Sequence, residues 1–292
     1  MKRLLALLLA LALLPALSAA ESYDEEADLY IEEIIEVVDL DAEEAGEAVP
    51  SSGDAAWTFP IPLEEMDPSL IVLANKHYKL DKSFVPKDLV KVPRENKGGI
   101  AWAVAPKNGQ QLRRACSDAL SEMNAAIKAE GGYKTLYLKS AYRSWSTQNT
   151  MYYNRLKRNN GKDDGWVSQP GSSDHQTGLG CDVVPRSWRD KAMNDKMMKE
   201  PECQWMAEHC HEFGFIIRYP EDKQEITEIN TEPWHLRYVG IPVAAYMKEN
   251  NLCLEEFTQE LQAAIADFVA QGGDPALVEP FIQVPTEESE EN

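Results

Sequence analysis

The segment SSDHQTGLGCDVV, residues 172–184, places a histidine and a carboxylate on either side of a glycine turn. His175 comes before Gly178 and Gly180, and glycine allows the tight turns that other residues resist. The run GLGCDVV predicts a strand, so Asp182 returns toward the turn on that strand. An imidazole and a carboxylate brought together in this way are two of the three protein ligands that a catalytic zinc ion uses.

A second segment, EPWHLRYVG at residues 232–240, supplies the third candidate ligand. His235 would arrive from a distant part of the chain, and two imidazoles with one carboxylate leave the fourth zinc position for water. Glu232, three residues earlier, could lie beside that water and take its proton. Two histidines and an aspartate occur by chance in most chains of this length, so spacing alone leaves a metal site and structural histidines both open.

The other histidines and the cysteines are better explained by structural roles than by metal binding. His209 and His211 are two residues apart on a predicted helix, where their side chains face different directions. His77 lies in a lysine-rich stretch, and Cys181 on a strand would point away from Asp182. The odd number of cysteines leaves at least one unpaired within the chain. We expect mostly buried thiols at the five positions, Cys116, Cys181, Cys203, Cys210 and Cys253.

Hydrophobic periodicity predicts helices and strands that alternate irregularly along the middle of the chain. Strands are expected where polar and apolar residues alternate or an apolar run is short, at 135–144 and 178–184. A helix is expected at 110–129, where apolar residues recur at three and four. Helices are also expected at 146–159, 203–215 and 241–271, the last with a break at Asn250-Asn251. The alternation lacks a regular strand–helix–strand period, so α+β is the predicted fold class.

Charge divides the 292-residue chain into a neutral body and two acidic flanks. The whole chain carries 49 acidic against 29 basic residues, a formal net charge of −20. Residues 21–69 hold 17 acids with no Lys or Arg, and residues 276–292 hold five acids with no bases. We expect 21–69 to be an acidic spacer, 70–257 the folded domain and 258–292 a helical, acidic tail. No clustered basic excess is present, so we expect no nucleic-acid partner.

The first 20 residues have the pattern of a secretory signal peptide. Lys2 and Arg3 precede an eleven-residue apolar run, Leu4 to Leu14, and Ser18 to Ala20 offer small residues for cleavage. The apolar run is too short to span about 30 Å of hydrocarbon comfortably. We therefore expect a secreted, extracytoplasmic and cell-wall-associated protein with no stable membrane anchor after signal cleavage. We also expect the protein to be a monomer.

Three blocks in order, SAYRSWSTQ at 140–148 and the two segments above, resemble the signature blocks of the VanY-type D-alanyl-D-alanine carboxypeptidases. These are zinc peptidases of peptidoglycan metabolism, and the stretch LANKHYKLDKSFVPKDLV at 73–90 resembles the segment that opens their catalytic domain. The resemblance covers about residues 70–257. It implies a Hedgehog/DD-peptidase-like zinc peptidase fold, with a small central antiparallel sheet and flanking helices.

The resemblance also implies roles for individual residues. Zn²⁺ would be held by His175, Asp182 and His235. Glu232 would be the general base, and Arg143 the cation that faces the scissile carbonyl. Ser173 and Gln148 match positions that line the substrate site. One departure is Gly180-Cys181, which stands where an alanine and an aliphatic residue are more usual and should alter packing rather than ligation.

The function implied is a secreted zinc carboxypeptidase that removes the terminal D-alanine from peptidoglycan stem peptides. A zinc-activated water would attack, with Glu232 as base. Whether the bond cleaved is D,D or L,D stays open, because both activities occur among close relatives. Two alternatives also stay open. A peptidoglycan endopeptidase would use the same zinc site, and a non-catalytic cell-wall-binding protein would have the same fold.

Overall fold

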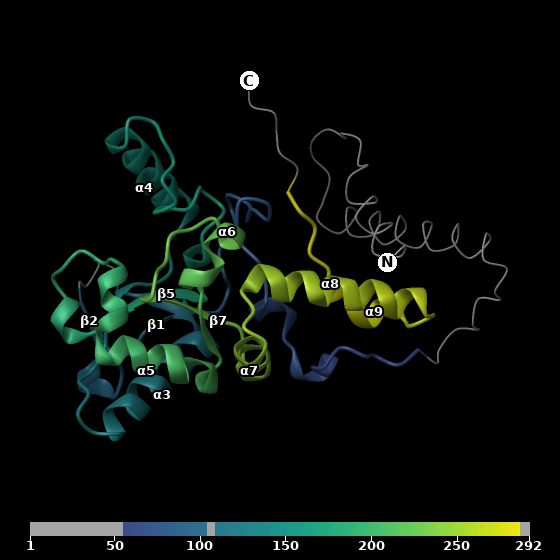
Figure 1. Ribbon diagram of the computed structural model, residues 1–292, viewed down its shortest axis with the longest axis horizontal. Helices are drawn as coiled ribbons and strands as arrows, with labels where there is room; N and C mark the ends of the chain where they lie inside the picture. The colour runs from purple at the N-terminus through teal and green to yellow at the C-terminus, as the bar shows by residue number, and fades with distance from the viewer. Residues whose placement is uncertain (1–54, 104–108, 287–292) are drawn as a thin grey trace. The chain divides into compact units, whose positions relative to one another are not determined.

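The computed structural model describes residues 55–103 and 109–286, and their elements follow in Figure 1. The strands are β1 (Leu89–Lys91), β2 (Ala101–Trp102), β3 (Gln111–Arg113), β4 (Tyr137–Ser140), β5 (Gly180–Val184), β6 (Phe215–Ile217) and β7 (His235–Tyr238). The α-helices are α3 (Arg114–Ala129), α4 (Trp145–Arg158), α5 (Pro201–His209), α6 (Gln224–Thr227), α7 (Ile241–Glu249), α8 (Leu254–Ala270) and α9 (Pro275–Val278). The 3₁₀ helices are η1 (Leu63–Glu65), η2 (Pro68–Leu70), η3 (Glu95–Lys97), η4 (Asp174–Thr177), η5 (Arg186–Trp188), η6 (Asp195–Lys199), η7 (Cys210–Phe213), η8 (Glu221–Lys223) and η9 (Glu279–Phe281).

The central sheet has five strands in the order β2-β4-β5-β7-β6, and a two-stranded sheet joins β1 to β3. The pairs β4–β5, β5–β7 and β6–β7 are antiparallel, so the predicted α+β fold with a small central sheet is confirmed. The edge pair β2–β4 is parallel, which the residue pattern did not predict. Parallel neighbours need a long crossover connection, and helix α3 lies within the chain that joins β2 to β4.

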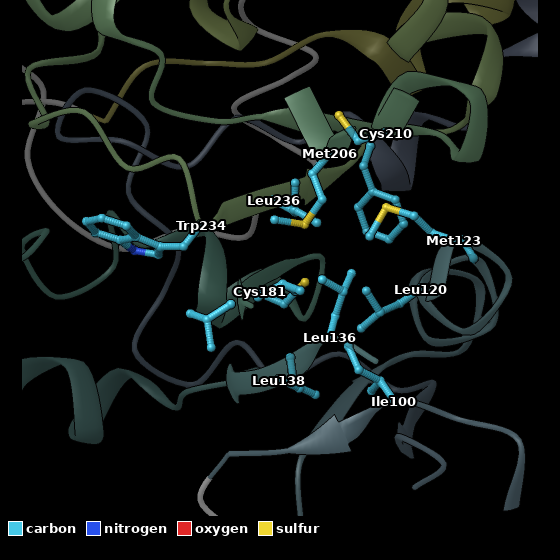
Figure 2. Close-up of a cluster of buried hydrophobic side chains, with 14 of the residues drawn as sticks. Ile100, Leu120, Met123, Leu136, Leu138, Cys181, Met206, Cys210, Trp234 and Leu236 are labelled. Atoms are coloured by element: carbon cyan, nitrogen blue, oxygen red, sulfur yellow. The ribbon is translucent and has the colours of Figure 1, made fainter. Parts of the chain in front are cut away.

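Helix α3 packs one apolar face on the central sheet, as its three-and-four spacing predicted. Leu120 and Met123 of this face pack in one buried cluster with Leu138 of β4 and Cys181 of β5 (Figure 2). The helix ends before Gly131, whose φ of +75° suits glycine. It begins at Arg114, later than predicted, because residues 111–113 pair with β1 as a strand.

A second hydrophobic cluster joins segments from the two ends of the described chain. Phe59 and Met66, within the predicted spacer, pack with Leu254 and Phe257 of α8 and with Phe281. The predicted boundary after residue 257 falls inside α8. The division into domains stays a prediction, and its signal peptide and most of its acidic spacer lie outside the described residues.

All five cysteines are buried and free, as predicted. No helix of the described residues is both long and apolar enough to span a bilayer.

Candidate metal centre

Strand pairing brings the three predicted metal ligands together. In the antiparallel pair β5–β7, Asp182 lies directly opposite His235. His175 reaches the same place from η4, and its ring centroid lies 4.8 Å from that of His235. Asp182 Oδ1 lies 3.4 Å from His175 Nε2 and 3.3 Å from His235 Nδ1. Among residues 55–103 and 109–286, this is the single group of His, Cys, Asp or Glu side chains that could hold a metal ion.

The orientation of His175 directs a lone pair into the cluster. Its Nδ1 lies 2.7 Å from the backbone oxygen of Ala141, which can only accept, so Nδ1 carries the proton. Nε2 is then an acceptor that faces the carboxylate of Asp182, and it has no hydrogen-bond partner among the described residues. Buried polar atoms are normally paired, so two acceptors facing each other indicate room for a cation.

The donor spacing fits zinc. Ligand bonds of about 2.0–2.1 Å at tetrahedral angles separate neighbouring donor atoms by about 3.4 Å. The two separations from Asp182 Oδ1, 3.4 and 3.3 Å, match this value. Two imidazoles and one carboxylate are also a donor set typical of a catalytic zinc site with an open fourth position.

The surroundings of the cluster shift the pKa values of its two histidines in opposite directions. Burial lowers the pKa of His175 to about 4, and the nearby Arg143 acts in the same direction. Burial also disfavours the charged form of His235, but Asp182 and Glu232 outweigh it and raise the pKa of His235 to about 10. The two imidazoles in turn hold the pKa of Asp182 low, against the effect of burial. The cluster therefore stabilises positive charge next to Asp182, which a divalent cation would supply.

Glu232 lies at the edge of this cluster. Its Oε2 is 3.3 Å from His235 Nδ1, and burial raises the pKa of its carboxyl group. The backbone holds it in a tight turn, in which His235 N donates to Glu232 O at 3.0 Å. Trp234 within this turn is buried and stacks on Trp166 at a ring distance of 6.4 Å. A carboxylate held rigidly beside a metal site is in position to move a proton.

Arg143 approaches the cluster from the residues after β4. Its backbone nitrogen donates to His175 O at 3.1 Å, and its Nη1 contacts Met151 Sδ at 3.4 Å. Its Nε is buried without a hydrogen-bond partner, and no described carboxylate lies within ion-pair distance of the guanidinium. Burial lowers its pKa, while Asp182 and Glu232 oppose this. The side chain therefore keeps donors available for a negatively charged group.

The two predicted substrate residues are both buried. Ser173 directly precedes η4, and its side chain does not cap that helix. Gln148 lies on α4 and donates to Ser168 O at 2.7 Å, while its Oε1 has no partner in the described part of the chain. Their contact with a substrate stays a prediction.

Sequence reasoning missed four residues around the cluster. The Tyr219 ring packs against His235 at 5.0 Å, and Asp174 forms ion pairs with Arg218 and Arg237 behind the site. Asp174 and Arg237 lie within two quoted segments, where a charged residue in a buried strand or turn could have marked them. Tyr219 and Arg218 had no comparable signal.

Comparison with known proteins agrees with this geometry. The family model described as VanY, D-alanyl-D-alanine carboxypeptidase, matches residues 109–241. The chain is 31% identical over 207 residues to the bifunctional D-Ala-D-Ala dipeptidase and carboxypeptidase VanXYC of Enterococcus gallinarum, covering 67% of this chain and 97% of that protein. This chain belongs to the VanY family. It is also 30% identical over 223 residues to a D-alanyl-D-alanine carboxypeptidase of Enterococcus faecium, with 74% of this chain and 68% of that protein covered.

A solved structure of the LD-carboxypeptidase LdcB matches with a TM-score of 0.59 and 36% identity, over 66% of this chain and 87% of LdcB. Family membership confirms the resemblance, the fold and the enzyme class, a zinc carboxypeptidase of the D-alanyl-D-alanine type. The donor cluster of this VanY-family chain fits its zinc cofactor. The roles of its individual residues are proposed below.

Proposed function

We propose that this VanY-family protein removes the terminal D-alanine from peptidoglycan stem peptides, with zinc held by His175, Asp182 and His235. The observation that carries the proposal is the buried donor cluster, spaced for zinc, with Glu232 at its edge. The names of two relatives, D-Ala-D-Ala carboxypeptidases, support the class of substrate.

The chain's own residues supply the acid–base chemistry and charge stabilisation. Zinc, when bound, supplies a Lewis acid that lowers the pKa of water from about 15.7 toward 7. Glu232 accepts a proton from the attacking water and then donates it to the leaving amine. Arg143 stabilises the negative charge that develops on the carbonyl oxygen, and losing one such donor typically costs on the order of 10²–10³ in rate.

The specificity between D,D and L,D bonds stays open in this proposal. Relatives include proteins named for D-Ala-D-Ala cleavage and an LD-carboxypeptidase. Incubation with defined stem tetrapeptide and pentapeptide, followed by mass spectrometry, tests the proposal. We expect at least one peptide to lose D-alanine. The peptide that does so shows whether a D,D or an L,D bond is cleaved.

Two results would overturn the proposal. If neither peptide is shortened by zinc-loaded protein, the carboxypeptidase activity is absent and wall binding alone is favoured. If neither peptide is shortened but cross-linked peptidoglycan, assayed in parallel, is cleaved without release of free alanine, the enzyme is an endopeptidase. The matched control is Glu232→Gln protein with its zinc content measured.

We further propose that residues 1–20 are a cleaved signal peptide and that the protein acts outside the cytoplasm, at the cell wall, as a monomer without a stable membrane anchor. The positive start and the eleven-residue apolar run of this segment support export. Sequencing the N-terminus of the exported protein tests it, and a mature protein that still begins at Met1 would contradict it.

A further inference from the structure

Four charged side chains lie in the core directly beside the metal cluster. Asp174, Arg218 and Arg237 are completely buried, and the Glu255 side chain is 12% exposed. We call these four residues the buried ion network. It contains two acids and two bases, so its formal charges cancel.

Each charge of the network has a close partner. Arg218 Nε donates to Asp174 Oδ2 at 2.7 Å, and Arg237 Nη1 donates to Asp174 Oδ1. The other end of Arg218 forms two parallel hydrogen bonds to Glu255, at 2.8 and 2.6 Å. This forked arrangement is the strong form of an arginine–carboxylate contact, and it also fixes direction.

The network connects the elements that carry the metal ligands. Asp174 directly precedes His175 in η4, and Arg237 lies on β7 two residues after His235. The backbone nitrogen of Arg218 donates to His235 O at 3.0 Å. The network therefore holds η4 against β7, and with them the two histidines of the cluster.

Strand β5, which carries the third ligand Asp182, is packed against η4. A Cβ placed on Gly180 would lie 2.7 Å from the Cβ of Asp174 and 2.9 Å from its carbonyl carbon. Glycine at this position allows Asp174 to lie directly on β5. Asp182 is two residues further along that strand.

Glu255 enters the network from outside the matched part of the chain. It lies in the first turn of α8, whereas the family model ends at residue 241. Asn75 Nδ2 donates to Glu255 Oε1 at 3.2 Å and helps to orient it. Without Glu255, two buried arginines would share the single carboxylate of Asp174, and an unpaired buried charge is strongly unfavourable.

We infer that Glu255 of α8 is a positioning residue for the metal centre: through Arg218 and Asp174 it fixes the position of His175 relative to His235. The inference rests on the proposed function in so far as these histidines are the zinc ligands. Residues that orient metal ligands typically change metal affinity by about 10–100-fold when replaced.

Substitution of Glu255 with two matched controls on the same helix tests this. Glu255→Gln removes the charge inside the network, whereas Glu260→Gln changes an exposed residue that accepts a hydrogen bond from Tyr246 Oη. Glu256→Gln weakens the start of α8, because the Glu256 carboxylate accepts from Cys253 N and pairs with Lys223. It thus destabilises the helix without touching the network.

The measurements are Zn²⁺ affinity by chelator competition and the visible spectrum of the Co²⁺-loaded protein. We expect Glu255→Gln to bind Zn²⁺ about 10–100-fold more weakly, with an altered Co²⁺ spectrum. On the stem peptide that the assay above shows to be cleaved, kcat should fall more than KM rises. Both control variants should keep wild-type affinity and spectrum, even where Glu256→Gln lowers the melting temperature.

Wild-type affinity and spectrum in Glu255→Gln would overturn the inference, as would an equal loss in Glu256→Gln. If Glu255→Gln does not fold, Asn75→Asp replaces the amide donor with a carboxylate oxygen facing Glu255. A smaller loss of affinity is then expected, and an unchanged affinity overturns the inference. The metal measurements need no peptide, so a wild-type protein that binds Zn²⁺ but cleaves nothing refutes the proposed function alone.

Discussion

The metal cluster and the buried ion network lie side by side, are both buried, and differ in how completely their charges are paired. Asp174 of the network and Asp182 of the cluster are both buried carboxylates whose pKa is lowered against the effect of burial. Two arginines lower the pKa of Asp174, and two imidazoles lower that of Asp182. Arginine is always charged, whereas imidazole exchanges its proton readily or binds a metal instead.

The difference shows what marks a site in a protein core. Both regions are buried, so burial does not distinguish the metal cluster from the buried ion network. The charges of the network are paired with one another, so none of them is left without an ionic partner. The cluster leaves Nε2 of His175 without a hydrogen-bond partner in the described chain, 3.4 Å from Asp182 Oδ1, and His235 Nδ1 lies 3.3 Å from the same oxygen. Unused donor atoms that converge, rather than buried charge as such, indicate the place where a ligand binds.

The largest expected effect is that of His175→Ala. Removing one of three donors should abolish stoichiometric zinc and reduce carboxypeptidase activity below detection, because the remaining two ligands cannot hold the ion in place. Elemental analysis of the purified variant measures the zinc, and circular dichroism serves as the folding control. Full zinc occupancy in this variant would remove His175 from the ligand set.

Glu232→Gln should separate metal binding from chemistry. The amide keeps the size of the side chain but cannot accept a proton, so we expect zinc content near wild type and a rate lower by about 10²–10⁴-fold. Single-turnover assays on the stem peptide measure the rate. An unchanged rate would exclude Glu232 as the base.

Asp174→Asn should show that the network is structural. Removing the shared carboxylate charge leaves Arg218 and Arg237 only partly compensated, and breaking such a buried pair costs about 3–5 kcal/mol. Urea unfolding measures the loss in the free energy of unfolding. A variant as stable as the wild type would mean that the network contributes little, and the contrast between the two regions would fail.

The smallest effect is expected from an exposed ion pair. Lys76 and Glu228 are 2.6 Å apart, with side chains 42% and 44% exposed. Lys76→Ala should change the free energy of unfolding by less than about 1 kcal/mol, because water screens such pairs. The same urea experiment measures it. A loss as large as that of Asp174→Asn would show that burial does not govern the strength of these pairs.

The sequence predicted the donors of the site better than its surroundings. His175, Asp182, His235 and Glu232 sit in two short segments whose residue types made them candidates, and the resemblance of these segments to a known family assigned their roles. The network could not be named in this way, since its partners are far apart in sequence: Arg218 lies 44 residues from Asp174 and 37 from Glu255. Local patterns carry no information about such pairs.

The same limit explains which features of the fold the residue pattern did not predict. Helices and strands were placed from local periodicity, but the parallel pairing of β2 with β4 depends on where α3 packs. The packing of Phe59 and Met66 against α8 depends on a contact between the two ends of the described chain. Neither the strand pairing nor this packing produces a periodic pattern in the sequence.

The sequence by itself supplied the candidate donors, because residue type and short spacing are local properties of the chain, and its resemblance to a family supplied their roles. The tertiary structure alone decided which buried charges are paired and which are left to bind a cation. That outcome depends on the register of β5 with β7 and on the approach of α8, and both are set by packing between distant segments.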